Sequence, residues 1–250
     1  MKLIKGIILI GAFVATILVI MKFTNTQSIE YMTLETSDNK NIAYDYYSVE
    51  SPRGWIIFTH MMPATKESWK DIAEALQKEG YESVAIDLRG HGISDGGPNG
   101  YKDFSDADHQ KSIVDIVAAW QFLQSRGAVP EKTALIGASI GANLSLQFGA
   151  ENPALKSIVL LSPGLDYRGI RATPLIQQLS SQQRVVIATS KDDNNNSEES
   201  MALYQGAPHD MKKHIIIFDK GGHGTDLFKN KAEYDLEGAL KEFLKTGEIL

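Results

Sequence analysis

The sequence predicts a doubly wound α/β fold, in which a mostly parallel sheet of eight strands carries helices on both faces. Short apolar runs alternate along the chain with segments of helical periodicity, and this alternation is typical of βαβ units. The later runs are almost continuous in Ile, Val and Leu, as expected of strands buried on both faces. A chain of 250 residues, 43% of them hydrophobic, suits one domain with a sizeable core.

Eight apolar runs are the candidate strands. The first two alternate with polar residues and are candidates for an antiparallel edge. The runs are IEYMTLET (29–36), NIAYDYYSV (41–49), GWIIFTH (54–60), ESVAIDL (82–88), TALIGA (133–138), KSIVLLS (156–162), RVVIATS (184–190) and HIIIFDK (214–220).

Helices are predicted over 66–80, 106–127 and about 231–244, because apolar side chains recur there on one helical face. The first two are expected to end at Gly80 and Gly127. The apolar faces consist of Trp69, Ile72, Ala73 and Leu76; of Ile113, Ile116, Val117, Trp120 and Leu123; and of Leu236, Leu240 and Phe243.

The amino terminus predicts a membrane anchor over residues 1–23, a tether over 24–28 and the α/β domain over 29–250. Residues 6–21 carry no charge and lie between Lys5 and Lys22. Sixteen helical residues span roughly 24 Å, slightly less than a ~30 Å hydrocarbon core. Apolar neighbours extend the segment if the lysines snorkel to the membrane surface.

Two alternatives to an anchor remain, a cleaved signal peptide and a buried core helix. The short apolar region suits a signal peptide, but IMKFTNTQS contains no small-x-small cleavage site. Lys2, Lys5 and the amino group outweigh Lys22, so the domain is expected outside the cytoplasm. Cleavage would instead give a secreted protein.

Composition excludes several classes of partner. A net charge of −6 without a basic block argues against nucleic acid, and the absence of cysteine excludes disulfides and thiolate chemistry. Neither a cofactor nor a metal is expected, because no histidines share spacing with a carboxylate partner. His109 is expected on a helix surface. The oligomeric state stays open.

A candidate nucleophile, Ser139, lies in GASIG between an apolar run and a helical segment. Such a strand-to-helix turn raises the hydroxyl above the sheet and directs the first helix amides towards the same point. The motif alone is weak. A dinucleotide-binding loop would read G-x-G-x-x-G and would follow the first strand of its unit.

A nucleophilic serine needs a base that is oriented by a carboxylate. His223 lies in a glycine-rich loop after the last strand, and Asp192 and Asp193 follow the seventh strand. Ser139, an aspartate and His223 therefore stand in the chain order that this geometry requires, and either aspartate can be the acid. An oxyanion would need the amide of Ile140 and a second amide from HMMPA (60–64).

From about Ser28 onwards the chain resembles an α/β-hydrolase, of the lidless dienelactone-hydrolase-like or small esterase type. The resemblance rests on four ordered motifs, THMMP, DLRGHGISDG, GASIGA and GGHG. It implies Ser139 as nucleophile, His223 as base and Asp193, three residues after a small residue, as acid. It also implies a structural His60 and a turn shaped by Asp87, Arg89, Gly90 and Gly92.

In this family the oxyanion amides would be those of Met62 and Ile140. The family usually has glycine directly after the loop histidine, whereas this chain has Met61, so the amide of Met61 is the alternative donor.

These observations predict a membrane-tethered serine hydrolase that cleaves a small ester or related acyl compound. The segment 162–183 leaves room for about one helix before the next strand, so the site is expected to be open and unlike that of a lipase. Arg168 and Arg171 are candidates for attracting an anionic substrate. The alternatives are a catalytically silent binding module, an acyltransferase and a peptidase.

Overall fold

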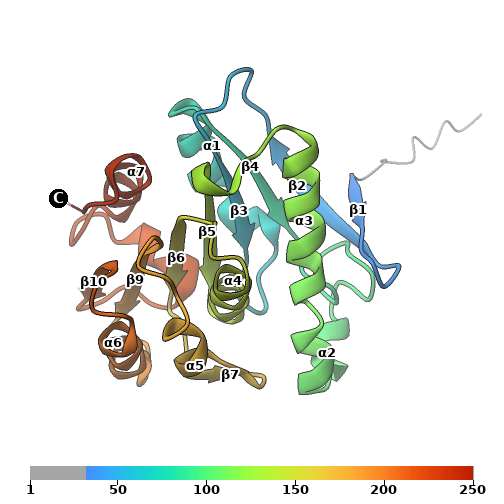
Figure 1. Ribbon diagram of the computed structural model, residues 1–250. Coiled ribbons are helices and arrows are strands. Elements are labelled where there is room, and N and C mark those ends of the chain that lie inside the picture. Colours follow the sequence, from blue (N-terminus) through green and yellow to red (C-terminus); the bar gives the residue numbers. More distant parts are fainter. Residues whose placement is uncertain (1–31, 250) are drawn as a thin grey trace, which may run out of the picture. The chain divides into compact units, whose positions relative to one another are not determined.

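One eight-stranded sheet runs through the computed structural model, which describes residues 32–249 (Figure 1). The pairs β1–β2 and β2–β4 are antiparallel, and the other five pairs are parallel. The predicted sheet and its antiparallel edge are thus confirmed. In spatial order the strands are β1 (Thr33–Glu35), β2 (Asn41–Tyr47), β4 (Tyr81–Ile86), β3 (Gly54–Thr59), β5 (Thr133–Ala138), β6 (Ser157–Leu161), β9 (Arg184–Ser190) and β10 (Lys212–Phe218).

Helices cover both faces of this sheet. Side chains from α3, α4, α5 and α6 join one hydrophobic cluster, and those from α1 and α7 join the other. The helical elements are η1 (Lys66–Trp69), α1 (Lys70–Lys78), η2 (Gly100–Asp103), α2 (Asp106–Gln110), α3 (Ile113–Ser125), η3 (Pro130–Lys132), α4 (Ile140–Glu151), α5 (Ala172–Ile176), α6 (Asn196–Gly206), η4 (Gly224–Lys229) and α7 (Leu236–Thr246).

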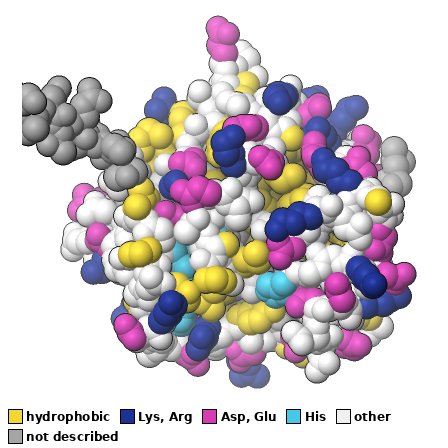
Figure 2. Space-filling model, turned by 180° about the vertical axis from the view of Figure 1, so that it is seen from behind, with side chains coloured by type: hydrophobic (Ala, Val, Ile, Leu, Met, Phe, Trp, Pro, Cys, Tyr) yellow, Lys and Arg dark blue, Asp and Glu magenta, His cyan; other side chains and the backbone are white. Residues whose placement is uncertain are grey.

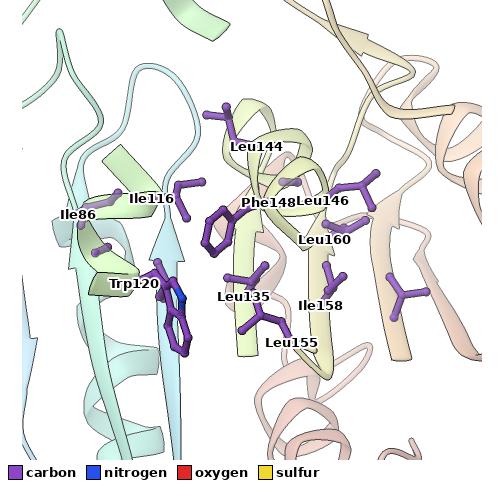
Figure 3. Close-up of a cluster of buried hydrophobic side chains, with 14 of the residues drawn as sticks. Ile86, Ile116, Trp120, Leu135, Leu144, Leu146, Phe148, Leu155, Ile158 and Leu160 are labelled. Carbon is purple, nitrogen blue, oxygen red and sulfur yellow. The ribbon is translucent and has the colours of Figure 1, made fainter. Parts of the chain in front are cut away.

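The helix that follows Ser139, α4, is buried within the first cluster. Leu144, Leu146 and Phe148 of α4 lie among side chains of the sheet and α3, including Leu135 and Trp120 (Figure 3). Close packing on several sides fixes the position of α4. The start of this helix is therefore a rigid platform for the residue before it.

Four elements differ from the prediction. The helix expected over 66–80 begins as the 3₁₀ helix η1 and is α-helical only from Lys70 to Lys78. The helix expected over 106–127 is divided into α2 and α3, and His109, expected on a surface, is buried against the ring of Phe104. The last helix starts at Leu236 rather than near 231, because the carboxylate of Asp235 accepts the N–H of Gly238 as a helix cap. A short hairpin of β7 (Asp166–Tyr167) and β8 (Ile170–Arg171) precedes α5.

The predicted anchor (1–23) and tether (24–28) lie outside the described residues and remain predictions. Between residues 32 and 249, no helix is both long and apolar enough to cross a membrane.

Candidate active site

Ser139 occupies a strained turn between β5 and α4. Its φ and ψ are 55° and −123°, a conformation that side chains other than glycine rarely adopt. The backbone is held in place because the Ser139 N–H donates to the Leu161 carbonyl at 2.8 Å. The residue is 7% exposed, so a small part of it faces solvent at the carboxyl edge of the sheet. The predicted nucleophile thus lies in a tight, strained strand-to-helix turn.

Both positions of the GASIG motif that hold glycine are too crowded for any larger residue. A Cβ on Gly137 would collide with the backbone of Gly141, and a Cβ on Gly141 would collide with the carbonyls of Thr59 and His60. The turn therefore lies directly against the end of β3, where the predicted oxyanion loop begins. Larger residues would separate these two segments.

The structure brings His223 and Asp193 together. The imidazole Nδ1 lies 2.5 Å from the Asp193 carboxylate, and the two side chains are 32% and 10% exposed. They follow β10 and β9, which are neighbouring parallel strands, so both residues leave the sheet at the same edge. A carboxylate on Nδ1 leaves Nε2 as the nitrogen available for a proton transfer.

Asp192 binds the backbone of the two glycines that precede His223 in the loop after β10. Its Oδ1 accepts the N–H groups of Gly221 and Gly222, each at 3.0 Å, and lies 2.5 Å from the hydroxyl of Ser190. These hydrogen bonds lower the pKa of Asp192 to about 2. Asp192 thus anchors the two residues that precede His223.

No hydrogen bond joins Ser139 to His223 within residues 32–249; the imidazole Nδ1 is bonded to Asp193. Bonds between a nucleophile and its base are commonly long before substrate binds. The sequence-predicted residues therefore share one edge of the sheet without forming a continuous hydrogen-bonded chain.

Tyr167, which the sequence did not single out, lies beside Ser139. Its hydroxyl is 3.4 Å from the Ser162 carbonyl and 3.3 Å from the Asn196 amide nitrogen. Burial and the charge of Asp193 raise the pKa of Tyr167 to about 12, although the nearby Ser139 side chain opposes the shift. The phenol is therefore a neutral hydrogen-bond donor at physiological pH.

A buried asparagine of α4 holds the segment that carries Tyr167. Asn143 donates its amide to the carbonyls of Gly164 and Ile170, at 3.0 and 2.9 Å, and accepts the Gly164 N–H at 3.2 Å. The only sequence signal for Tyr167 is its place shortly after β6, at the edge where ligands bind in such sheets.

His60 joins the loop after β3, which is the predicted oxyanion loop, to the turn after β4. Its Nε2 accepts the Leu88 N–H at 2.9 Å, so the proton resides on Nδ1, which lies 2.9 Å from the Met61 carbonyl. Burial and the nearby ring of His91 lower the pKa of His60 to about 3. A fully buried, neutral ring of this kind has the structural role that the resemblance implies.

Met61 and Met62 follow His60 at the end of β3, and both are half-buried. Met61 packs beside Gly224, where an added Cβ would collide with its sulfur. Met62 packs against the cluster on the other face of the sheet. Ile140, whose amide is the other predicted donor, is the first residue of α4.

The turn after β4 is tied to its surroundings by charged groups. Asp87 accepts the N–H groups of Lys66 and Ile93, at 2.8 and 3.1 Å, and thereby joins the loop after β3 to this turn. Arg89 binds the buried Asp115 through its backbone and its guanidinium, and also pairs with Asp38. These contacts fix the turn after β4 against the loop after β3, α3 and the segment between β1 and β2.

A pocket of about 580 Å³ opens beside His223. Its lining is polar and partly acidic: Asp166, Tyr167, Asp193, Asn194, Asn195, Asn196, Glu199 and His223. Arg168 and Arg171 are not part of it, and the Arg168 guanidinium lies 4.0 Å from Asp106. Within the part of the chain that the structure describes, no cluster of His, Asp and Glu could hold a metal ion.

The strand order and the site at the carboxyl ends define an α/β-hydrolase fold, and comparisons with known proteins agree. The profile of the serine aminopeptidase S33 family matches residues 50–201, more than half of the chain. The chain belongs to this family of α/β-hydrolases.

Individual relatives are more distant. A polyketide transferase of Stachybotrys chlorohalonatus is 31% identical over 127 residues, which are 46% of this chain and 41% of that protein. A non-heme chloroperoxidase of Streptomyces lividans is 32% identical over 99 residues, 39% of this chain and 33% of that one. The chain thus spans less than half the length of either relative. The structure of a Pyrococcus furiosus esterase has a TM-score of 0.69 at 20% identity, covering 86% of this chain and 89% of the esterase.

Proposed function

We propose that this chain is a serine hydrolase that cleaves a small ester through a Ser139–His223–Asp193 triad. The observation that supports this most is the 2.5 Å contact between His223 Nδ1 and Asp193, at the same sheet edge as the strained turn of Ser139. A silent binding module would have no need for an imidazole oriented by a carboxylate at the same sheet edge as a serine in a strained turn.

In the proposed reaction, Ser139 Oγ attacks the ester carbonyl while His223 Nε2 takes its proton. The resulting oxyanion is stabilised by the amides of Ile140 and Met62, or Met61 in place of Met62. His223 then returns the proton to the leaving alcohol, which gives an acyl-enzyme. Water, deprotonated by His223, hydrolyses the acyl-enzyme and regenerates Ser139, while Asp193 stabilises the imidazolium in both steps.

The pocket favours a neutral or cationic acyl substrate over an anionic one. Asp166 and Glu199 line it, whereas Arg168 and Arg171 do not. Two carboxylates near the reacting centre would repel an anionic acyl group. A panel of esters that differ only in a neutral, cationic or anionic acyl substituent tests this: kcat/KM is expected to be lowest for the anionic ester.

Labelling with a fluorophosphonate probe tests the nucleophile. The wild type is expected to react, and Ser139→Ala is expected to lose both labelling and ester hydrolysis, the latter by several orders of magnitude. Ser125→Ala, which changes an exposed serine at the end of α3, is the control and is expected to react normally. An unreactive wild type would favour the silent module, and labelling of Ser139→Ala would place the nucleophile elsewhere.

Peptide cleavage is a second candidate. The serine aminopeptidase match and the carboxylates of Asp166 and Glu199, which could bind a substrate ammonium group, favour it. Comparing an aminoacyl ester with the matching aminoacyl anilide separates the two activities. Similar kcat/KM values for both compounds would favour the peptidase.

We also propose that residues 1–23 tether the domain to a membrane, with the domain outside the cytoplasm. The full chain should then stay with membranes in high salt and dissolve in detergent, and protease added to intact cells should reach the domain. A mature protein that begins after Phe23 would indicate signal cleavage instead.

A further inference from the structure

A second pocket, of about 250 Å³, lies at the opposite edge of the sheet from Ser139. Its lining contains the first residue of four strands of the parallel part of the sheet, namely Tyr81, Thr133, Ser157 and Arg184. The hairpin β7–β8 and α5, which follow the carboxyl end of β6, mark the other edge, at the bottom of Figure 1. A ligand in this pocket would leave the candidate active site free.

The pocket is strongly basic. Arg53, Lys132, Arg184 and Lys245 line it, against the single carboxylate of Glu131. Within residues 32–249 none of these four cations makes an ion pair. On the face seen in Figure 2, acidic and basic side chains are interspersed. The chain as a whole has a net charge of −6, so this group of four cations contrasts with its overall charge.

Arg184 is held in position by groups that do not neutralise it. Its Nε donates to the Ser157 hydroxyl at 2.8 Å, its Nη2 donates to the Leu244 carbonyl at 2.9 Å, and the guanidinium carbon lies 5.0 Å from the centre of the Phe243 ring. Burial lowers the pKa of Arg184, and the carboxylate of Glu248, which pairs with Lys212, opposes this shift only in part. A bound anion would supply the missing counterion.

We propose that this pocket binds the phosphate group of a small ligand. A preoriented guanidinium presents N–H donors in a fork that matches phosphate oxygens, and such charge-assisted bonds are stronger than neutral ones. Lys132, Lys245 and Arg53 are exposed and can turn towards the bound anion from the rim. The phosphate group belongs either to a soluble phosphomonoester or to the phosphodiester headgroup of a membrane lipid.

Calorimetric titration of the full chain in a nonionic detergent tests the proposal. The two probes are glycerol 3-phosphate, a phosphomonoester, and glycerophosphoglycerol, a lipid-headgroup phosphodiester. Saturable binding of at least one probe is expected. Tighter binding of the monoester identifies a soluble ligand, and tighter binding of the diester identifies a lipid headgroup.

Two variants locate the binding. Lys132→Gln/Lys245→Gln removes exposed charges from the rim and is expected to weaken phosphate binding about tenfold. Arg184→Lys keeps the charge but loses the fork, and it is also expected to weaken binding. Lys111→Gln/Lys231→Gln removes the same charge from exposed positions outside the pocket and is expected to bind as the wild type does.

Thermal unfolding of each variant verifies that it is folded. Three results would overturn the proposal: no saturable binding of either probe, an equal loss of affinity in the rim variant and its control, or binding of acetate as tight as that of the phosphate esters. Since Lys132 and Lys245 lie away from Ser139, these results leave the proposed hydrolase activity untouched.

Discussion

The side chains of Asp192 and Asp193, two adjacent residues after β9, contact different partners. Asp193 meets the imidazole of His223, whereas Asp192 accepts the N–H groups of Gly221 and Gly222. One residue orients the proposed base, and the other orders the loop that carries it.

Replacing each aspartate with asparagine separates these contributions. Asp193→Asn is expected to lower kcat about 10⁴-fold, because an amide cannot hold the productive tautomer of the histidine or stabilise its charged form. Asp192→Asn keeps an acceptor oxygen for the two glycines and should cost less than about tenfold. Steady-state kinetics on one ester measures both, and the reverse ranking would move the role of acid to Asp192.

Tyr167 gives a second prediction for a single residue. Tyr167→Phe removes the hydroxyl beside Ser139 while keeping the ring, and kcat is expected to fall about 10- to 100-fold with little change in KM. Tyr204→Phe, on α6, is the matched control. An unchanged rate of fluorophosphonate labelling in Tyr167→Phe would show that the phenol only packs in the pocket wall.

Secondary-structure elements around the site are joined by buried polar contacts as well as by apolar packing. Arg89, in the turn after β4, binds Asp115 of α3 on one side and Asp38, between β1 and β2, on the other. Asp115 is fully buried, while the Asp38 side chain is 39% exposed. One guanidinium thus connects three separate parts of the chain.

The two carboxylates should contribute unequally to stability. Asp115→Ala removes a fully buried carboxylate that accepts hydrogen bonds from both the backbone and the guanidinium of Arg89, and is expected to lower the free energy of unfolding by about 3–5 kcal/mol. Asp38→Ala removes a solvent-exposed partner and should cost at most about 1 kcal/mol. Chemical denaturation of the full chain measures both, and equal losses would contradict the importance assigned to burial.

At the scale of the whole molecule, His60 couples stability to pH. Its folded-state pKa of about 3 lies below the ordinary value of 6.5, so the unfolded chain binds a proton more readily between these values. The contribution of His60 is therefore fully present above pH 6.5 and is lost as the pH falls towards 3. One such group changes the free energy of unfolding by at most about 1.4 kcal/mol per pH unit.

His60→Asn isolates this contribution from those of the carboxylates. The variant is expected to be less stable than the wild type at pH 7, because it loses the hydrogen bonds that His60 makes. The difference between the two proteins should then shrink as the pH is lowered from 6.5 to 3. A stability difference that stays constant over this range would mean that His60 binds its proton equally well in the folded and unfolded chains, and that its folded-state pKa is not lowered.

The order of the elements and the general place of the site follow from the sequence alone. Runs of Ile, Val and Leu have the length and continuity of buried parallel strands, and the glycines around Ser139 mark a turn that only small residues allow. The spacing along the chain also places a serine, two aspartates and a histidine at strand ends on one edge. These are local properties, so they can be read without coordinates.

Only the tertiary structure decided which groups meet at that edge. Asp192 and Asp193 are adjacent in the chain and follow the same strand, but each carboxylate contacts a different partner across the loop. Tyr167 reaches Ser139 because Asn143 holds the intervening segment. The four cations of the basic pocket lie far apart in the sequence, between positions 53 and 245. Contacts between such distant residues depend on strand order and side-chain packing, and not on local sequence.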